Sequence, residues 1–251
     1  MRGGSIQDVC GCFPTGRHYP GIAERIARSA GAVKGLARHI EPEAEWVASK
    51  LAVIDFETTG LSPENDRVIE IGVVCFEGGE LSGLKNWLVN PGIPVPEESR
   101  AVHNISDEEL AGAPTFREVL PELTEMLSGC LPVAYNAVFD RGFLHAELAR
   151  AGADRGESAP PAYQAEVTWV DPLVWSRELD KDQRSHKLGN VCARLGVTLD
   201  NAHRAASDAE ATGRVLLAFA PRMPATYAEL IRIQAQYAAT QEVDLSWRRR
   251  P

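Results

Sequence analysis

The sequence predicts an α/β protein with a mixed sheet surrounded by helices. Strand-like stretches come first as an adjacent pair joined by a tight turn, and later ones alternate with helical stretches. The chain has 251 residues, 44% of them hydrophobic and 24% charged, which is typical of a globular protein with a large core. We expect a main domain over residues 46–220, an N-terminal extension over 1–45 and a C-terminal helical tail over 221–251.

The first 45 residues differ in character from the rest. Apolar residues at helical spacing over 21–40, with basic residues between them, predict a basic amphipathic helix. Such a helix either contacts nucleic acid, a partner or a membrane surface, or packs on the main domain with a solvated basic face. Cys10, Cys12 and His18 supply three candidate zinc ligands where a structural zinc site needs four.

Five stretches predict strands. The apolar run 51–54 leads into the first acidic motif, and the β-rich run 68–76 is followed by a glycine turn at 77–80. Residues 81–89 are expected to return as the second arm of a hairpin. Two shorter strands are expected over 131–135 and 167–170.

The helices are expected between and after these strands. Ser106 precedes three acids, which indicates a capped helix start. Residues 152–164 are rich in glycine, alanine and proline and predict an exposed loop. Apolar periodicity predicts further helices over 115–127, 136–150, 172–178, 188–195, 209–219 and 225–240.

Charge, cysteines and hydropathy limit the classes of function. The net charge of −9 argues against a protein that coats nucleic acid, but not against an enzyme whose acids bind Mg²⁺. Five cysteines, mostly in apolar runs, indicate reduced thiols in a cytoplasmic protein. No stretch approaches the roughly 18 apolar residues of a membrane helix, and no apolar signal core follows Met1, so no membrane association is expected.

Two acids at the end of the first strand carry the first chemical signal. Because strand side chains alternate, Asp55 and Glu57 share one face while Ile54 and Phe56 share the other. Two carboxylates at a buried strand end repel each other unless a cation holds them, and a divalent metal is the simplest such cation. The alternative is a half-exposed strand end with two solvated acids.

Three further residues stand where strands and helices meet. Asp140 follows the strand 131–135 in the first turn of a helix, near where open α/β sheets bind ligands. Asp208 opens the last core helix, and His203 is expected on the loop five residues before it. Taken alone, these are ordinary helix-start acids and an ordinary loop histidine.

Together the motifs resemble a known family. Residues 55–60 (DFETTG), 136–140 (NAVFD) and 203–208 (HRAASD) are similar to the three motifs of the DEDD family of 3′→5′ exonucleases. The histidine five residues before the last aspartate matches the histidine subclass, which includes the epsilon proofreading subunit of bacterial DNA polymerase III, ribonuclease T and oligoribonuclease. The resemblance runs from about residue 51 to residue 219.

The resemblance implies a ribonuclease-H-like fold with a mixed five-stranded sheet flanked by helices. It implies that Asp55, Glu57, Asp140 and Asp208 hold two Mg²⁺ or Mn²⁺ ions, hard cations that prefer oxygen ligands. It also implies that His203 is the general base of a hydrolysis that releases nucleoside 5′-monophosphates from 3′ ends.

The resemblance further implies a pocket for the terminal nucleotide. Core packing is an equal explanation for two of its members, Leu61 and Phe139, and Glu70 and Asp171 are interpreted as structural. Asn104 stands where the family often has glycine, and both residues tolerate a left-handed backbone. The residues expected to line the pocket are Thr58, Leu61, His103 and Phe139.

Alternatives remain for the substrate and the partner. Single-stranded DNA is favoured, and RNA trimming is the first alternative because sugar preference depends on a few contacts to the 2′ position. A proofreading subunit docked to a DNA polymerase is the second, although residues 220–251 contain no recognised polymerase-binding motif. A catalytically inactive nucleic-acid-binding relative is disfavoured because no ligand position is substituted.

Overall fold

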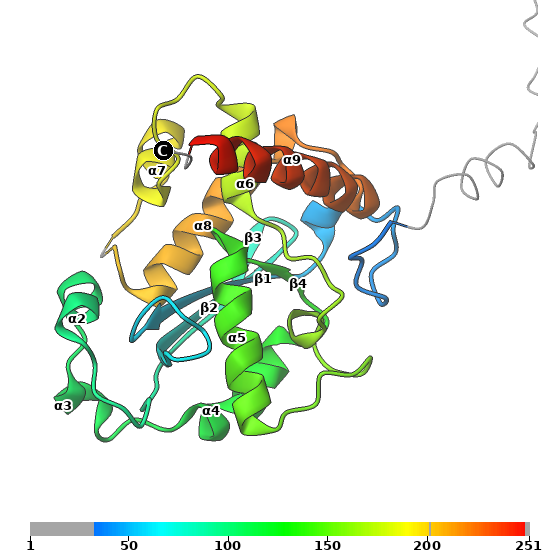
Figure 1. Ribbon diagram of the computed structural model, residues 1–251. Helices are drawn as coiled ribbons and strands as arrows, with labels where there is room; N and C mark the ends of the chain where they lie inside the picture. The colour runs from blue at the N-terminus through cyan, green and yellow to red at the C-terminus, as the bar shows by residue number, and fades with distance from the viewer. Residues whose placement is uncertain (1–32, 201, 249–251) are drawn as a thin grey trace, which may run out of the picture. The chain divides into compact units, whose positions relative to one another are not determined.

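The computed structural model describes residues 33–200 and 202–248. Within them a four-stranded mixed sheet has the order β3-β2-β1-β4, with β1 antiparallel to β2 and parallel to β4. Figure 1 shows this sheet at the centre of the helices. The strands are β1 (Leu51–Thr58), β2 (Val68–Glu77), β3 (Glu80–Leu88) and β4 (Leu131–Val133).

The five-strand count was wrong, because the stretch 167–170 does not form a strand. Val170 alone pairs, in an isolated parallel bridge to Val133. The chain cannot continue the ladder, since Pro172 has no N–H and begins a helix two residues later. Before the bridge, the Thr168 N–H donates at 2.9 Å to the carbonyl of Gly35, outside the sheet.

The α-helices follow the predicted order, with one addition. The predicted stretch 188–195 is observed with those bounds, whereas α8 begins four residues earlier than expected. The helix α2 was not predicted, although Pro96 followed by two acids is a helix-start signal. The helices are α2 (Glu97–His103), α3 (Asp107–Leu110), α4 (Phe116–Leu127), α5 (Ala137–Ala151), α6 (Pro172–Leu179), α7 (Leu188–Leu195), α8 (Ala205–Phe219) and α9 (Tyr227–Arg248), with short 3-10 turns η1 (Trp46–Ala48), η2 (Pro161–Tyr163) and η3 (Ala220–Arg222).

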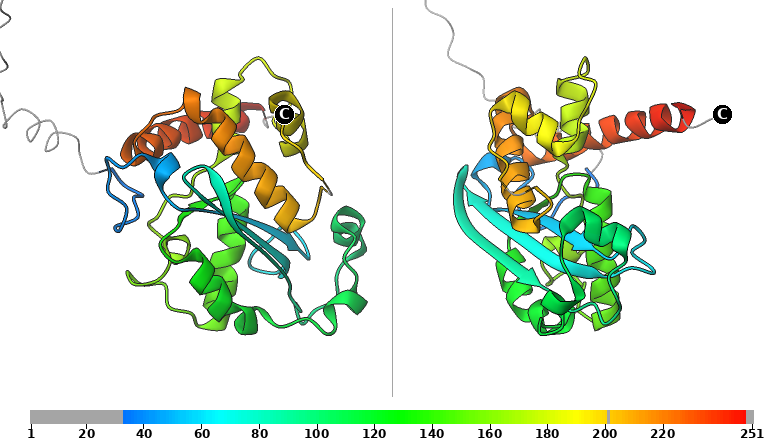
Figure 2. Two further views of the ribbon diagram at one scale, coloured as in Figure 1. Left: turned by 180° about the vertical axis from the view of Figure 1, so that it is seen from behind. Right: turned by 90° about the vertical axis from the view of Figure 1, so that its left-hand side faces the viewer.

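The sheet separates two layers of helices, as the two further views in Figure 2 show. Leu51 and Val53 of β1 belong to the core shared with α6, α7, α8 and α9. Ile54 and Phe56 belong to the core shared with α4 and α5. The predicted alternation of β1 is therefore confirmed. None of the helices in this part of the chain is long and apolar enough to cross a membrane.

Residues 33–40 differ from expectation. The helix expected over 21–40 does not extend through 33–40, which form turns, because Gly35 has φ +90°. This segment packs against α9, where the Tyr227 hydroxyl accepts the Ala37 N–H at 2.9 Å. The domain boundaries at 45 and 220 stay predictions. Residues 21–32, the Cys10/Cys12 pair with His18, and residues 249–251 lie outside the described residues.

The loop expected to be exposed over 152–164 is exposed only in its first half. Residues 160–164 are buried, and η2 lies within them. The Tyr163 hydroxyl lies 3.1 Å from that of Thr124 in α4, and Tyr163 belongs to the same core as the buried side chains of α4. Local composition could not show that this part of the loop packs against a distant helix.

The backbone at the start of α8 packs directly against Gly72 in β2. A Cβ added at Gly72 would lie 2.2 Å from the carbonyl carbon of Ala205, a backbone atom that cannot rotate away. We expect Gly72→Ala to lower the free energy of unfolding, measured in urea, by about 1–3 kcal/mol, the usual cost of overpacking. Gly83→Ala is the matched control, because a Cβ there meets nothing closer than 3.8 Å. Equal losses in the two variants would contradict the close approach.

Candidate active site

Four carboxylates from three elements meet at the end of β1. Asp55 and Glu57 lie in β1, Asp140 lies in the first turn of α5, and Asp208 lies in the first turn of α8. The backbone N–H of Phe56 donates to Asp140 Oδ1 at 3.1 Å, which ties α5 to β1 between the two strand acids. The structure therefore brings together all four predicted metal ligands.

Burial is the main reason that the pKa values of these acids are raised, and repulsion by neighbouring carboxylates adds to it. Burial raises the pKa of Asp55 well above its usual range, and the charges of Asp140 and Asp208 raise it further. Burial and the charge of Asp208 raise the pKa of Glu57 to about 8. Burial also raises the pKa values of Asp140 and Asp208. Such a cluster favours a cation that would neutralise it.

His203 lies beside this cluster on the loop before α8. Its backbone has φ +67°, and its N–H donates to Asp208 Oδ2 at 3.1 Å. Glu57, His203 and Asp208 each present a ligand atom within 4.8 Å of the others. The predicted loop position is confirmed, and it lets the histidine and the aspartate converge as one helix would not. The neighbouring Asn201, expected to form the turn, is outside the described part of the chain.

The carboxylate of Asp171 binds the backbone at the start of α5. It accepts the backbone N–H groups of Asn136 and Ala137, each at 3.0 Å. These contacts cap a helix whose own N-cap residue, Asn136, makes no side-chain cap. They orient the first turn, from which Asp140 reaches β1. The structural interpretation of Asp171 agrees with these contacts.

Two of the predicted pocket residues are buried close to the acids. The Thr58 hydroxyl donates to the carbonyl of Gly60 at 2.6 Å and so shapes the turn after β1. His103 ends α2, and its Nδ1 accepts the Ile105 N–H at 3.1 Å, which places the ring proton on Nε2. That Nε2 is buried and finds no hydrogen-bond partner among the described residues. Burial lowers the pKa of His103 and favours its neutral form.

The other two predicted pocket residues, Leu61 and Phe139, differ in exposure. Leu61 is 85% exposed, which excludes core packing as its explanation. Phe139 packs against Phe143 with ring centroids 4.9 Å apart, at the edge of the core under α5. Val138, inside the second motif, is also exposed at 83%. Exposed apolar side chains at Leu61 and Val138 are available for contact with a ligand.

One contact near the pocket was not foreseen from the sequence. The Ser99 hydroxyl of α2 donates to the carbonyl of Thr59 at 2.7 Å. This bond fixes α2, and with it His103, against the turn after β1. A lone serine in a loop-like stretch has no pattern that would have identified it.

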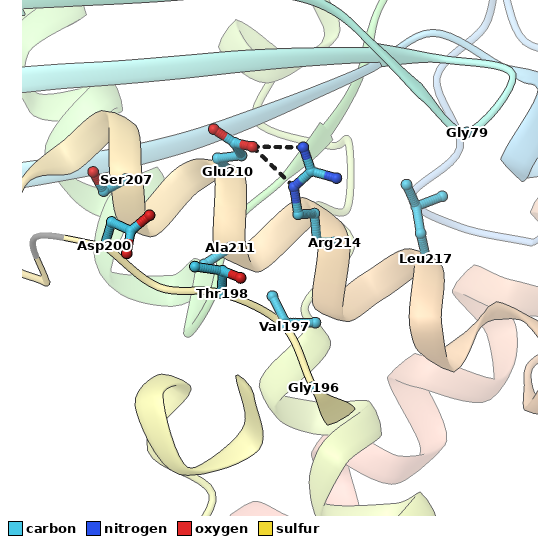
Figure 3. A pocket seen from close by; sticks show the side chains of 10 residues that line it. All are labelled: Gly79, Gly196, Val197, Thr198, Asp200, Ser207, Glu210, Ala211, Arg214 and Leu217. Carbon is cyan, nitrogen blue, oxygen red and sulfur yellow. Dashed lines mark hydrogen bonds and ion pairs between the residues drawn. The ribbon is translucent and has the colours of Figure 1, made fainter. Parts of the chain in front are cut away.

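A separate hollow of about 640 Å³ lies between α8 and the loop after α7 (Figure 3). The ion pair between Glu210 and Arg214, 2.6 Å long, lies along its wall on α8. Thr198 and Asp200 line the loop side. None of the predicted site residues lines this hollow, so it is distinct from the carboxylate cluster.

Comparison with known proteins shows the family of the chain. The exonuclease family model RNase_T matches residues 52–216, more than half of the chain. The DNA polymerase III PolC-type of Clostridium perfringens (strain 13 / Type A) is 35% identical over 177 residues, 70% of this chain. The chain spans only 12% of the length of that relative.

Two solved structures share the fold. E. coli exonuclease I in complex with a dT13 oligonucleotide has a TM-score of 0.60 at 18% identity, covering 69% of this chain and 42% of that chain. The nuclease domain of 3′hExo, a DEDDh family member bound to rAMP, has a TM-score of 0.59 at 20% identity, covering 74% and 97%. The ribonuclease-H-like fold class is thereby confirmed. The chain belongs to the RNase_T exonuclease family, and within it to the DEDD type of 3′→5′ exonuclease that its motifs indicate.

Proposed function

We propose that the chain is a metal-dependent enzyme that hydrolyses phosphodiester bonds at the 3′ ends of single-stranded DNA and releases nucleoside 5′-monophosphates. The observation that carries this proposal is the convergence of four carboxylates beside His203 in a member of an exonuclease family. A hydrolase with this arrangement needs no covalent intermediate, since water is the nucleophile.

Exonucleases of this type use divalent metal ions. Asp55, Glu57, Asp140 and Asp208 would hold two Mg²⁺ or Mn²⁺ ions, because hard cations prefer carboxylate oxygens. A bound cation would offset the burial and the mutual repulsion that raise the pKa values of Asp55 and Glu57. When bound, such a pair activates a water molecule and stabilises the leaving oxygen.

His203 would accept the proton of the attacking water. Its backbone bond to Asp208 holds the imidazole beside the acids, and a neutral ring has a free nitrogen for that proton. The terminal nucleotide would lie against Thr58, Leu61, His103 and Phe139. Exposed Leu61 offers an apolar surface to the base.

The pH dependence of stability tests the cation requirement. Glu57 binds its proton up to about pH 8 in the folded chain but only to its ordinary value of 4.5 when unfolded. The folded state therefore holds more protons between these values, so the metal-free protein loses stability as pH rises from about 4.5 to about 8. We expect the melting temperature of metal-free protein to fall over this range and Mg²⁺ to restore it at pH 8.

The control for this measurement is potassium chloride at matched ionic strength, which should not restore the melting temperature. At pH 5, where protons already neutralise the acids, Mg²⁺ should have little effect. An Mg²⁺ shift of equal size at pH 5 and pH 8 would contradict a cation site built from these carboxylates.

RNA trimming is the second candidate for the substrate. DNA is supported by the oligonucleotide bound to exonuclease I, and RNA by the adenylate bound to 3′hExo. The deciding experiment compares 5′-labelled DNA and RNA oligonucleotides of one sequence, each with a free 3′ end and with a blocked one, in Mn²⁺. We expect shortening from free 3′ ends, faster for DNA. No shortening of either strand would contradict the proposed function.

A role as the proofreading part of a DNA polymerase is a further proposal, supported by the PolC-type relative. The side of α9 that carries Tyr227, Leu230 and Ile231 is buried in the core, so this side of the tail is not free to dock. Of the N-terminal extension 1–45, residues 33–40 also pack against α9, so we propose the residues before them as the docking segment. Loss of a captured polymerase when they are deleted would support it. The cytoplasm stays the proposed compartment, and the described cysteines Cys75, Cys130 and Cys192 are free thiols, which is consistent with it.

A further inference from the structure

Glu70 and Arg204 form an ion pair directly behind the loop that carries His203. The Glu70 side chain lies in β2, is completely buried, and is paired across the sheet with Glu57 of β1. Arg204 Nε and Nη2 donate to Glu70 Oε1 at 3.0 and 2.6 Å. Asn86 of β3 donates to the same oxygen at 2.8 Å. The carboxylate is thus fully engaged by its neighbours.

The second oxygen of Glu70 caps α8 from outside the helix. Oε2 accepts the backbone N–H of Ala205, the first residue of α8, at 3.0 Å. The N-cap residue, Arg204, makes no side-chain cap of its own. Helix N-termini leave backbone N–H groups without partners, and a carboxylate there is the strongest acceptor. Glu70 therefore replaces the missing cap and fixes the position at which α8 begins.

This pairing constrains His203 from its C-terminal side. The left-handed backbone at His203 is costly for a residue with a Cβ and persists only where its surroundings hold it. Asp208 holds the His203 N–H, and the Glu70 pair holds the next two residues, Arg204 and Ala205. The imidazole is thus attached to a turn that is fixed at both ends.

We propose that Glu70 and Arg204 are positioning residues that hold His203 in place for proton transfer. This inference rests on the proposed function. Neither side chain needs to touch the substrate, because both act through the backbone of residues 203–205. A purely structural ion pair would affect stability alone, whereas a positioning pair affects the rate only while His203 is there to be positioned.

The test is a double-mutant cycle between Glu70→Gln and His203→Ala, measured as kcat and KM on whichever labelled oligonucleotide the wild type degrades. We expect Glu70→Gln alone to lower kcat by about 10–100-fold, the usual cost of losing an outer-shell partner, with KM changed by less than about threefold. In the His203→Ala background the same substitution should lower kcat by less than about threefold. An equal loss of kcat in both backgrounds would overturn the proposal.

Glu147→Gln is the matched control. Glu147 is also a buried carboxylate. It accepts two hydrogen bonds from the guanidinium group of Arg67 and one from the backbone N–H of Val68. It lies in α5, away from the His203 loop. We expect this variant to lose stability without a kcat loss that depends on His203.

Arg204→Lys keeps the experiment decisive if Glu70→Gln does not fold. Arg204 is 47% exposed, and lysine keeps the charge but not the two-pronged contact. Its loss of kcat should likewise vanish in the His203→Ala background, and a loss that persists there would overturn the proposal. An inert wild type would instead overturn the proposed function, so the two failures are distinguishable.

Discussion

Asp55→Asn is expected to abolish exonuclease turnover while leaving the metal-free protein at least as stable as the wild type. Burial and the neighbouring acids raise the pKa of Asp55, so its charge destabilises the folded, metal-free protein. Asparagine removes that charge and with it the attraction for a divalent cation. The loss of activity should exceed the roughly 10–100-fold that an outer-shell partner contributes.

Paired measurements of turnover and of melting temperature without metal check this expectation. Asp154→Asn is the control, because this exposed acid lies just past the far end of α5 and bonds only the nearby Gly156 N–H among the described residues. Turnover by Asp55→Asn within tenfold of the wild type would remove Asp55 from the metal site. A large drop in its melting temperature would indicate a structural role instead.

His203→Ala is expected to lower kcat by about 10²–10⁴-fold, the usual contribution of a general base. Its effect on metal affinity separates the role of a general base from that of a metal ligand. The second role is possible because a ring nitrogen of His203 lies within 4.8 Å of a carboxylate oxygen of Glu57 and of Asp208. A general base can be removed with little change in Mn²⁺ affinity, whereas loss of a ligand weakens that affinity. We expect the first result.

The control for His203 is His39→Ala, an exposed histidine in the segment before η1. It should keep the wild-type rate. A rate for His203→Ala within threefold of the wild type would remove His203 from the proposed role and leave the four carboxylates without a protein base.

The sequence predicted most of the fold because the relevant signals are local. Alternation along β1, the glycine turn of the hairpin and the apolar periodicity of α7 all depend on neighbours within a few residues. The errors have tertiary causes. Residues 33–40 form turns in place of the expected helix, and the Gly35 carbonyl in them accepts a hydrogen bond from the distant Thr168. Residues 167–170 fail as a strand because only Val170 reaches β4. No local pattern contains those contacts.

The site residues also divide into those that local patterns place and those that depend on tertiary contacts. Asp55 and Glu57 could be placed on one face from β periodicity alone, but nothing local places Asp140 and Asp208 beside them. Their grouping came from the resemblance of three motifs to a family. The contribution of Glu70 was not predictable from the sequence, because it caps a helix that begins 135 residues later.

Titration of Mn²⁺ into metal-free protein by calorimetry tests most directly whether the four carboxylates form one metal site. We expect saturable binding of two ions per chain at pH 8, weakened in both Asp55→Asn and Asp208→Asn and unchanged in Asp154→Asn. Each of the first two variants removes a ligand from a different element, so a common loss means that β1 and α8 bind the same ions. Absence of saturable binding, or equal binding by all variants, would contradict a metal site at the end of β1.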